Sequence, residues 1–117
     1  MLNWQLRYWA NNDHQRQIET WLDSLSKKQI KSIAKELTLL QRCGNTLCMP
    51  HSRSLGEGLF ELRERNFGYR IYYGFLPNCV IVLLHAGKKS TRQRDIITAR
   101  KRFAALKVKT NGLDNEN

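Results

Sequence analysis

The stretch from Gly58 to Arg102 constrains the fold of this chain more than any other segment. It holds three runs of strand length, at 59–65, 69–75 and 79–85. The residues Asn66–Gly68 and Pro77–Asn78 separate these runs, and such short turns predict an antiparallel meander. The cationic sequence GKKSTRQR follows the last run closely. We therefore expect a rigid sheet with positive charge gathered at one end, a surface suited to a phosphate-bearing partner.

Apolar spacing predicts one strand and two helices ahead of this stretch. Alternating apolar and polar residues at 3–9 indicate a half-buried strand. Apolar residues that recur every three or four positions predict helices at about 14–24 and 27–43. Ser26 and Gln29 form a capping box for the second helix, and Gly44 suits its C-terminal end in the left-handed conformation. Because few residues join the two helices, we expect an antiparallel hairpin.

The remaining segments complete a single domain. Residues 45–56, which include the helix breaker Pro50, are predicted to be irregular. A basic helix is predicted from Thr91 to about Leu106, and the polar residues 110–117 are expected to form a disordered tail. This order of elements is typical of an α+β domain, here covering residues 1–109. We expect the helical hairpin to pack on one face of a small, mostly antiparallel sheet.

The formal net charge of +10 bears on the partners of the chain rather than on its fold. Nucleic acid, an anionic membrane surface and an acidic protein all suit such a charge. No apolar run is long enough to span a bilayer, and the N-terminus lacks the pattern of a signal peptide. Nucleic acid is therefore the favoured partner, and no membrane association is expected.

The three cysteines, Cys43, Cys48 and Cys79, are an odd number without the spacing of a disulfide framework. Together with the missing signal peptide, they predict a reducing cytoplasm. Cys43, Cys48 and His51 are conceivable zinc ligands, but a fourth ligand is missing and the spacing fits no common pattern. We expect neither a metal site nor a cofactor.

Alternation along the strands sorts the side chains of the meander into two sets. The helical hairpin is expected to cover the first set: Phe60, Leu62, Ile71 and Tyr73. The second set is then expected on an open face: Glu61, Arg63, Arg70 and Tyr72. Further cations lie just after the last strand: Lys88, Lys89, Arg92 and Arg94. Their convergence at one end of one sheet indicates a ligand site.

Each of these side chains also has an ordinary structural explanation. Arg63 and Arg70 could pair with neighbouring glutamates across the strands, and Tyr72 could pack within the sheet. A lysine pair is usually solvated, and so is an arginine-rich helix face. His85 could be a hydrogen-bonded histidine at the edge of the core.

The chain resembles the RelE/ParE toxin superfamily of type II toxin–antitoxin systems in three motifs: GLFELRER at 58–65, YRIYYGF at 69–75 and VIVLLHAGKKSTRQRDIITARKR at 80–102. The resemblance is greatest to the phage-derived HigB-like branch. It implies a compact α+β domain with a curved sheet. It also implies a metal-independent endoribonuclease that cuts mRNA, usually on the translating ribosome, and that a small helix-turn-helix antitoxin silences in the cytoplasm.

The resemblance assigns site residues by motif match. The implied catalytic residues are Arg63, Arg70, Lys88 and Lys89. An arginine fork suits the charge that builds on phosphate oxygens when a ribose 2′-hydroxyl attacks the adjacent phosphorus. Lys88 or Lys89 could carry the protons, and His85 is the alternative because histidine titrates near neutrality. The implied RNA contacts are Tyr72, Arg65, Arg92, Arg94, Arg100 and Arg102.

The sequence also departs from related toxins. Several of them place a tyrosine or histidine near the C-terminus, whereas nothing aromatic or imidazole follows Phe103 here. The general acid and base therefore stay open. Two alternatives to the nuclease remain: a ParE-like inhibitor of DNA gyrase, and a non-catalytic module or toxin relic that binds nucleic acid.

Overall fold

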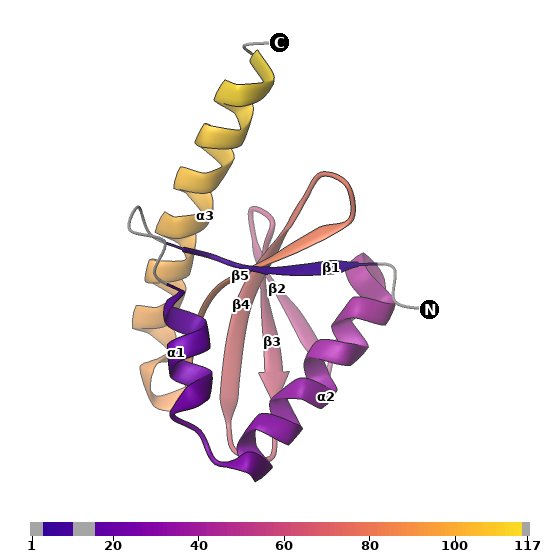
Figure 1. Cartoon of the computed structure of the whole chain (residues 1–117), viewed down its shortest axis with the longest axis vertical. Helices are drawn as coiled ribbons and strands as arrows, with labels where there is room; N and C mark the ends of the chain where they lie inside the picture. Colours follow the sequence, from indigo (N-terminus) through magenta and orange to yellow (C-terminus); the bar gives the residue numbers. More distant parts are fainter. Residues whose placement is uncertain (1–3, 11–15, 116–117) are drawn as a thin grey trace.

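The computed structural model describes residues 4–10 and 16–115, with side chains as far as Val108. Its elements are β1 (Gln5–Tyr8), α1 (Gln17–Asp23), α2 (Lys27–Cys43), the 3₁₀ helix η1 (Gly44–Thr46), β2 (Ser52–Gly56), β3 (Leu59–Glu64), β4 (Tyr69–Leu76), β5 (Val80–Lys88), the 3₁₀ helix η2 (Lys89–Thr91) and α3 (Arg92–Asn115). The strands of the described residues form one sheet in the order β1-β5-β4-β3-β2 (Figure 1). β1 is parallel to β5, and the other neighbours are antiparallel. The predicted α+β domain is confirmed.

α1 and α2 cover one face of the sheet, as the sequence predicts. Leu62, Ile71 and Tyr73 lie in one buried cluster with Ile18 of α1 and with side chains of α2. Phe60 packs against this cluster and stacks on Tyr73, with 5.5 Å between the ring centroids. The predicted division of the strands into two faces is therefore correct for the side under the helical hairpin.

The ends of α2 follow their sequence signals. The Ser26 hydroxyl accepts a hydrogen bond of 3.2 Å from the backbone N–H of Gln29, and the Gln29 side chain accepts one of 2.8 Å from the backbone N–H of Ser26. Gly44 follows the helix with φ +54° as expected, although its ψ of −128° is not left-handed helical. A Cβ at Gly44 would overlap the ring of Trp4, so glycine here also lets β1 approach the end of α2.

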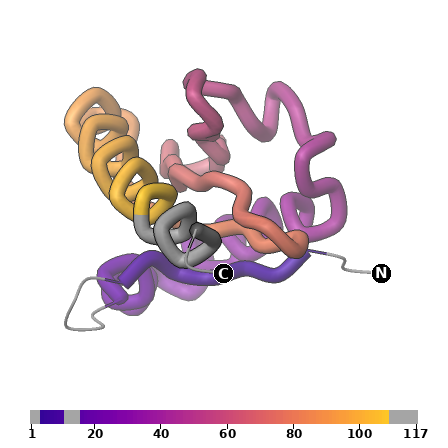
Figure 2. Tube along the Cα trace, turned by 90° about the horizontal axis from the view of Figure 1, so that it is seen from above, coloured from indigo at the N-terminus to yellow at the C-terminus, as the bar shows by residue number. Residues whose placement is uncertain are grey.

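α3 covers the opposite face of the sheet, which lies between it and the helical hairpin (Figure 2). Leu59, Tyr72 and Leu84 are buried against Ala99 and Phe103 of α3. Ala99 and Phe103 are four residues apart, and therefore share one side of the helix. The expectation of an open face is wrong, because the apolar side of α3 closes it.

The contact between α3 and β4 depends on the absence of a side chain at Gly74. A Cβ at this position would overlap the ring of Phe103. We expect Gly74→Ala to lower the free energy of unfolding by about 1–3 kcal/mol, because a close-packed core tolerates added volume poorly. Chemical denaturation measures this loss, and the double variant Gly74→Ala/Phe103→Leu should recover part of it. Equal stability of Gly74→Ala and the wild type would contradict this packing of α3.

Some boundaries differ from the prediction. Residues 52–56, expected to be irregular, form β2, whose sequence SRSLG has no apolar alternation and becomes a strand only by pairing with β3 at the sheet edge. α3 continues to Asn115, beyond the expected end near Leu106. The predicted helix start at His14 and the turn residues 11–13 lie outside the described residues. The domain boundary at residue 109 stays a prediction.

No helix in the described part of the chain is long and apolar enough to cross a membrane. Nor does it contain a group of three or more His, Cys, Asp or Glu side chains that could hold a metal ion. The cysteines are free thiols, two of them exposed. The described fold is therefore stabilised by its two hydrophobic clusters rather than by cross-links.

Candidate active site

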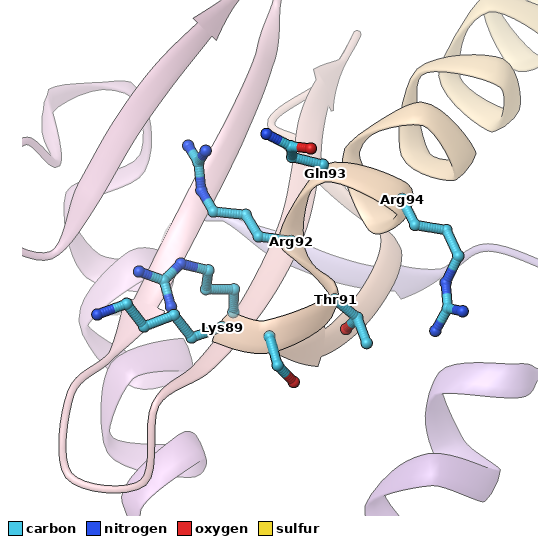
Figure 3. A pocket seen from close by; sticks show the side chains of 7 residues that line it. Lys89, Thr91, Arg92, Gln93 and Arg94 are labelled. Atoms are coloured by element: carbon cyan, nitrogen blue, oxygen red, sulfur yellow. The ribbon is translucent and has the colours of Figure 1, made fainter.

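Two hollows adjoin one another where the β3–β4 hairpin meets the end of β5 and the start of α3. The larger, the α3 hollow, has a volume of about 570 Å³ (Figure 3) and is lined by Arg70, Lys89, Ser90, Thr91, Arg92, Gln93 and Arg94. The smaller, the hairpin hollow, has a volume of about 150 Å³ and is lined by Arg63, Glu64, Arg65, Gly68, Arg70 and Lys89. Arg70 and Lys89 line both hollows and therefore lie between them.

The hollows collect positive charge at a cost to the sheet. Arg63 of β3 and Arg70 of β4 are directly opposite each other. Like charges at opposite positions destabilise an antiparallel pair. The Nε atoms of both side chains are also buried without a hydrogen-bond partner among the described residues. Two arginines placed opposite each other, with a buried Nε on Arg63 that has no partner in the described part of the chain, indicate a place prepared for an anion.

The buried carboxylate of Glu61 forms ion pairs with two of the arginines, Arg70 and Arg92. Its side chain is 1% exposed, and its Oε2 accepts a hydrogen bond of 2.7 Å from Nε of Arg92. Nε of Arg70 lies 3.3 Å from the same oxygen, close enough for an ion pair but not aligned for a hydrogen bond. Among the described residues, no group binds the terminal nitrogens of Arg70 or Arg92. These nitrogens can therefore bind phosphate oxygens.

Burial of Glu61 and Arg70 corrects the expectation that both are on an open face. Arg70 is 8% exposed and Glu61 is 1% exposed. Both side chains point to the side of the sheet that α3 covers, so the helix start lies over them. Arg70 nevertheless keeps contact with both hollows. Its burial makes it a fixed group in the floor of the site rather than a mobile one on its surface.

The first turn of α3 contributes the positive end of a helix dipole to the α3 hollow. The backbone N–H of Arg92 already donates to the carbonyl of Lys89 in η2, so the helix dipole and the side chains, rather than this amide, attract an anion here. Figure 3 shows Arg92 turned toward the strands, whereas Arg94 extends from the other side of this turn. The α3 hollow thus presents cations on both sides of a helix N-terminus.

His85 belongs to a network beneath α3 rather than to the hollows. Its Nε2 lies 2.9 Å from Oδ1 of Asp95, and its Nδ1 lies 3.2 Å from Nη1 of Arg102. Asp95 also accepts a hydrogen bond from the hydroxyl of Thr91. A bulge in β5 turns both Leu84 and His85 toward α3, which simple alternation does not predict. Because both ring nitrogens are bound, His85 is not placed to carry a proton of a substrate.

Arg100 and Arg102 connect α3 to the rest of the domain. Arg100 donates hydrogen bonds to the backbone carbonyls of Leu55 and Gly56. Arg102 donates one of 2.8 Å to the carbonyl of Leu84, and burial lowers the pKa of its guanidinium. Neither arginine lines a hollow. Their bonds make them anchors of the helix, and their predicted RNA contacts stay predictions outside the two hollows.

Lys88 and Tyr72 are also separate from the hollows. Lys88 pairs across the strands with Tyr69, which is buried toward α1 and α2. Since paired residues share a face, Lys88 lies on the side of the sheet opposite to Arg70. Tyr72 is 0% exposed, and burial, with a smaller contribution from Glu61, raises the pKa of its hydroxyl. The expectation that Tyr72 is available to stack on RNA is therefore wrong.

The structure brings together only part of the predicted set: Arg63, Arg65, Arg70, Lys89, Arg92 and Arg94. Their catalytic and RNA-binding roles stay predictions. The strand pattern indicates only a strand partner at Glu61, although its spacing of two from Arg63 places both residues on one face. Its true partner Arg92 is 31 residues away in the chain, and no local pattern reveals such a contact.

Known proteins match this chain over the segment that contains the two hollows. A family model described as "Phage derived protein Gp49-like (DUF891)" matches residues 20–104. An uncharacterized protein of Haemophilus influenzae is 33% identical over 85 residues, which is 70% of this chain and 81% of that protein. The family match includes every residue that lines the two hollows.

Proposed function

The chain belongs to the phage-derived Gp49-like family, a family of RelE-like toxins, and we propose that it is a HigB-like toxin that cleaves mRNA. The observation that carries this proposal is the position of Arg70 and Lys89 between two cationic hollows. A phosphodiester placed against them meets a guanidinium held by a buried carboxylate and an exposed ammonium group. The substrate is then RNA, cut on the translating ribosome in the cytoplasm.

The proposed reaction is transesterification at phosphorus without a metal ion. The ribose 2′-hydroxyl loses its proton and attacks the adjacent phosphorus, and the 5′ oxygen of the next nucleotide leaves with a proton. The products are a 2′,3′-cyclic phosphate and a free 5′-hydroxyl. Negative charge builds on the non-bridging oxygens, where fixed cations act most strongly. Each well-placed donor lowers such a barrier by about 3–4 kcal/mol.

Lys89 is the candidate for proton transfer. Its Nζ has no partner among the described residues, whereas Glu61 is held by arginines and Glu64 by backbone amides. Arginine stays protonated in proteins and therefore cannot act as a general base. Lys89 can therefore receive the 2′ proton or return one to the leaving oxygen.

The neighbouring lysines provide a matched test of this assignment. We expect Lys89→Ala to lower the rate of RNA cleavage by about 10²–10⁴-fold, the usual contribution of general acid–base catalysis. Lys88→Ala removes the same charge one residue away, on the other face of the sheet, and should leave the rate unchanged. The assay follows a labelled RNA in the presence of chelator, with and without translating ribosomes. Equal losses in both variants would contradict the assignment to Lys89.

The same assay separates the nuclease from its alternatives. Cleavage only with ribosomes supports a ribosome-dependent toxin, and cleavage of free RNA supports an independent one. Intact RNA together with gyrase-linked DNA breaks would replace the nuclease with a gyrase inhibitor. Intact RNA without such breaks, from folded protein at good expression, would indicate a relic that binds nucleic acid.

We further propose that the partner is a small helix-turn-helix antitoxin with an acidic segment. A row of carboxylates would meet the cations of the hollows and exclude RNA from them. The measurement is cleavage by the purified toxin after addition of the protein encoded by the adjacent gene. Inhibition that weakens as salt rises is the expected result. Cleavage at an unchanged rate with a saturating amount of that protein would contradict the pairing.

A further inference from the structure

We propose that the two hollows are separate phosphate subsites, one on each side of the bond that breaks. An RNA strand would then be held by three consecutive phosphates. The central phosphate lies between Arg70 and Lys89, and its neighbours occupy the hairpin hollow and the α3 hollow. This inference rests on the proposed function for the identity of the central phosphate, but binding at the flanking subsites can be measured without cleavage.

The hairpin hollow has the size and charge for a single phosphate group. Its volume of about 150 Å³ is below the range of about 300–1,000 Å³ that is usual for small-molecule pockets. Arg63 contributes a buried Nε without a hydrogen-bond partner in the described part of the chain, and Arg65 contributes an exposed guanidinium. Two arginines in so small a space favour a compact anion over a nucleobase.

The carboxylate in the hairpin hollow does not oppose this role. Glu64 accepts hydrogen bonds of 3.0 Å from the backbone N–H groups of Asn66 and Phe67. It also accepts one of 2.6 Å from the hydroxyl of Ser32 on α2. Its negative charge is therefore directed into the turn and toward α2, where it shapes the hairpin. The arginines on the open side of the hollow keep their charge for a ligand.

The α3 hollow is built for an anion in a different way. It combines the N-terminus of a long helix with Arg92 and Arg94. A second, independent feature is Arg70, which is 8% exposed and is fixed by Nε at 3.3 Å from Oε2 of Glu61, while its terminal nitrogens have no partner among the described residues. The volume of about 570 Å³ leaves room for a sugar or base beside the phosphate.

Shared walls link the two hollows into one track. Arg70 and Lys89 line both, and Lys89 is held near the hairpin by a backbone hydrogen bond of 3.1 Å to the carbonyl of Gly68. We expect a strand lying across this pair to place its next phosphate in one hollow and its previous phosphate in the other, because the hollows extend from Arg70 and Lys89 along different elements. Binding should therefore increase with each flanking phosphate, and each increase should depend on a different arginine.

The probes are four diadenosine ligands whose 2′-O-methyl group prevents cleavage. They share one internal phosphate and carry no terminal phosphate, a 5′-phosphate, a 3′-phosphate, or both. Calorimetric titration at low salt measures their affinities for the full chain. We expect each terminal phosphate to tighten binding about tenfold, the value of one charge-assisted hydrogen bond of about 1.5 kcal/mol.

The variants are Arg65→Gln in the hairpin hollow and Arg94→Gln in the α3 hollow. Both side chains are exposed, so the fold should persist, and thermal melting checks this. Arg65→Gln should abolish the gain from one terminal phosphate only, and Arg94→Gln the gain from the other only. The matched control Arg53→Gln removes an exposed arginine of β2 outside both hollows and should preserve both gains.

Two subsites are supported if each variant loses the gain from a different terminal phosphate and keeps the other, which we call a crosswise pattern. If both variants weaken the binding of all four ligands equally, the proposal of two subsites is wrong, and the hollows act as one diffuse region of positive charge. Terminal phosphates that add no affinity to the wild type would overturn the two subsites as well. The outcome is distinct from that of the cleavage assay. A crosswise pattern in a protein that does not cleave RNA would support the subsites and contradict the nuclease. Cleavage without the crosswise pattern would support the nuclease and contradict the subsites.

Discussion

Arg70→Ala is expected to slow RNA cleavage by about 10²–10³-fold, the cost of removing one preorganised donor from a developing oxyanion. The reason is that Arg70 is the guanidinium shared by both hollows, and its side chain is largely buried above Glu61. A group fixed before the substrate arrives loses no energy to reorganisation during the reaction. The measurement is the single-turnover rate on labelled RNA, beside the melting temperature of the same preparation.

Two further variants test the reason for this loss. Arg70→Lys keeps the charge but loses the planar guanidinium, so its rate of RNA cleavage should lie between those of the wild type and Arg70→Ala. Arg53→Ala removes an exposed arginine outside the hollows and should retain the wild-type rate. A folded Arg70→Ala protein that cleaves RNA at full rate would exclude Arg70 from the chemistry. The nuclease proposal would then rest on family membership alone.

Glu61→Gln is expected to produce the largest loss of stability among the substitutions considered, about 3 kcal/mol in the free energy of unfolding. The carboxylate is 1% exposed and faces Arg92 at 2.7 Å and Arg70 at 3.3 Å. Without it, two guanidinium groups share a buried site with no counter-charge. The value is at the lower end of the range because the side chain of Arg92 is 30% exposed and water can partly solvate it.

The controls separate loss of a buried charge from loss of any glutamate. Glu19 pairs with Arg16 at 3.2 Å on the exposed surface, and Glu19→Gln should cost about 1 kcal/mol or less. The double variant Glu61→Gln/Arg92→Gln removes one of the stranded cations and should recover part of the loss. Urea denaturation of the purified proteins measures all of these. If Glu61→Gln unfolds at the urea concentration of the wild type, the contacts of Glu61 with Arg70 and Arg92 do not stabilise the fold.

Much of the fold follows from patterns that are local in the chain. The two helices follow from apolar spacing, and the structure confirms them together with the capping box of Ser26 and Gln29. α1 and α2 diverge from the turn that joins them rather than packing along each other (Figure 1). The antiparallel meander follows from alternating strands with short turns. β2 could not be predicted in this way, because its polar sequence becomes a strand only when β3 offers its edge.

The candidate site was predictable in composition but not in geometry. The expectation that cations from β3, β4 and the start of α3 would meet was correct for Arg63, Arg70 and Lys89. It was not correct for Lys88, since the strand pairing puts that residue on the other face. His85 was unpredictable for a similar reason, because a bulge in β5 reverses the alternation of the residues that follow it.

Apart from β2, local chemistry was sufficient to establish the types of element, their order and the sheet face that α1 and α2 cover. Hydrophobic periodicity and turn residues act over a few positions, so a single chain displays them directly. Three-dimensional packing alone established the second buried face and the partners of the charged groups. α3 closes over Glu61 and brings Arg92 to it from 31 residues away, and a contact of that span leaves no periodic trace in the chain.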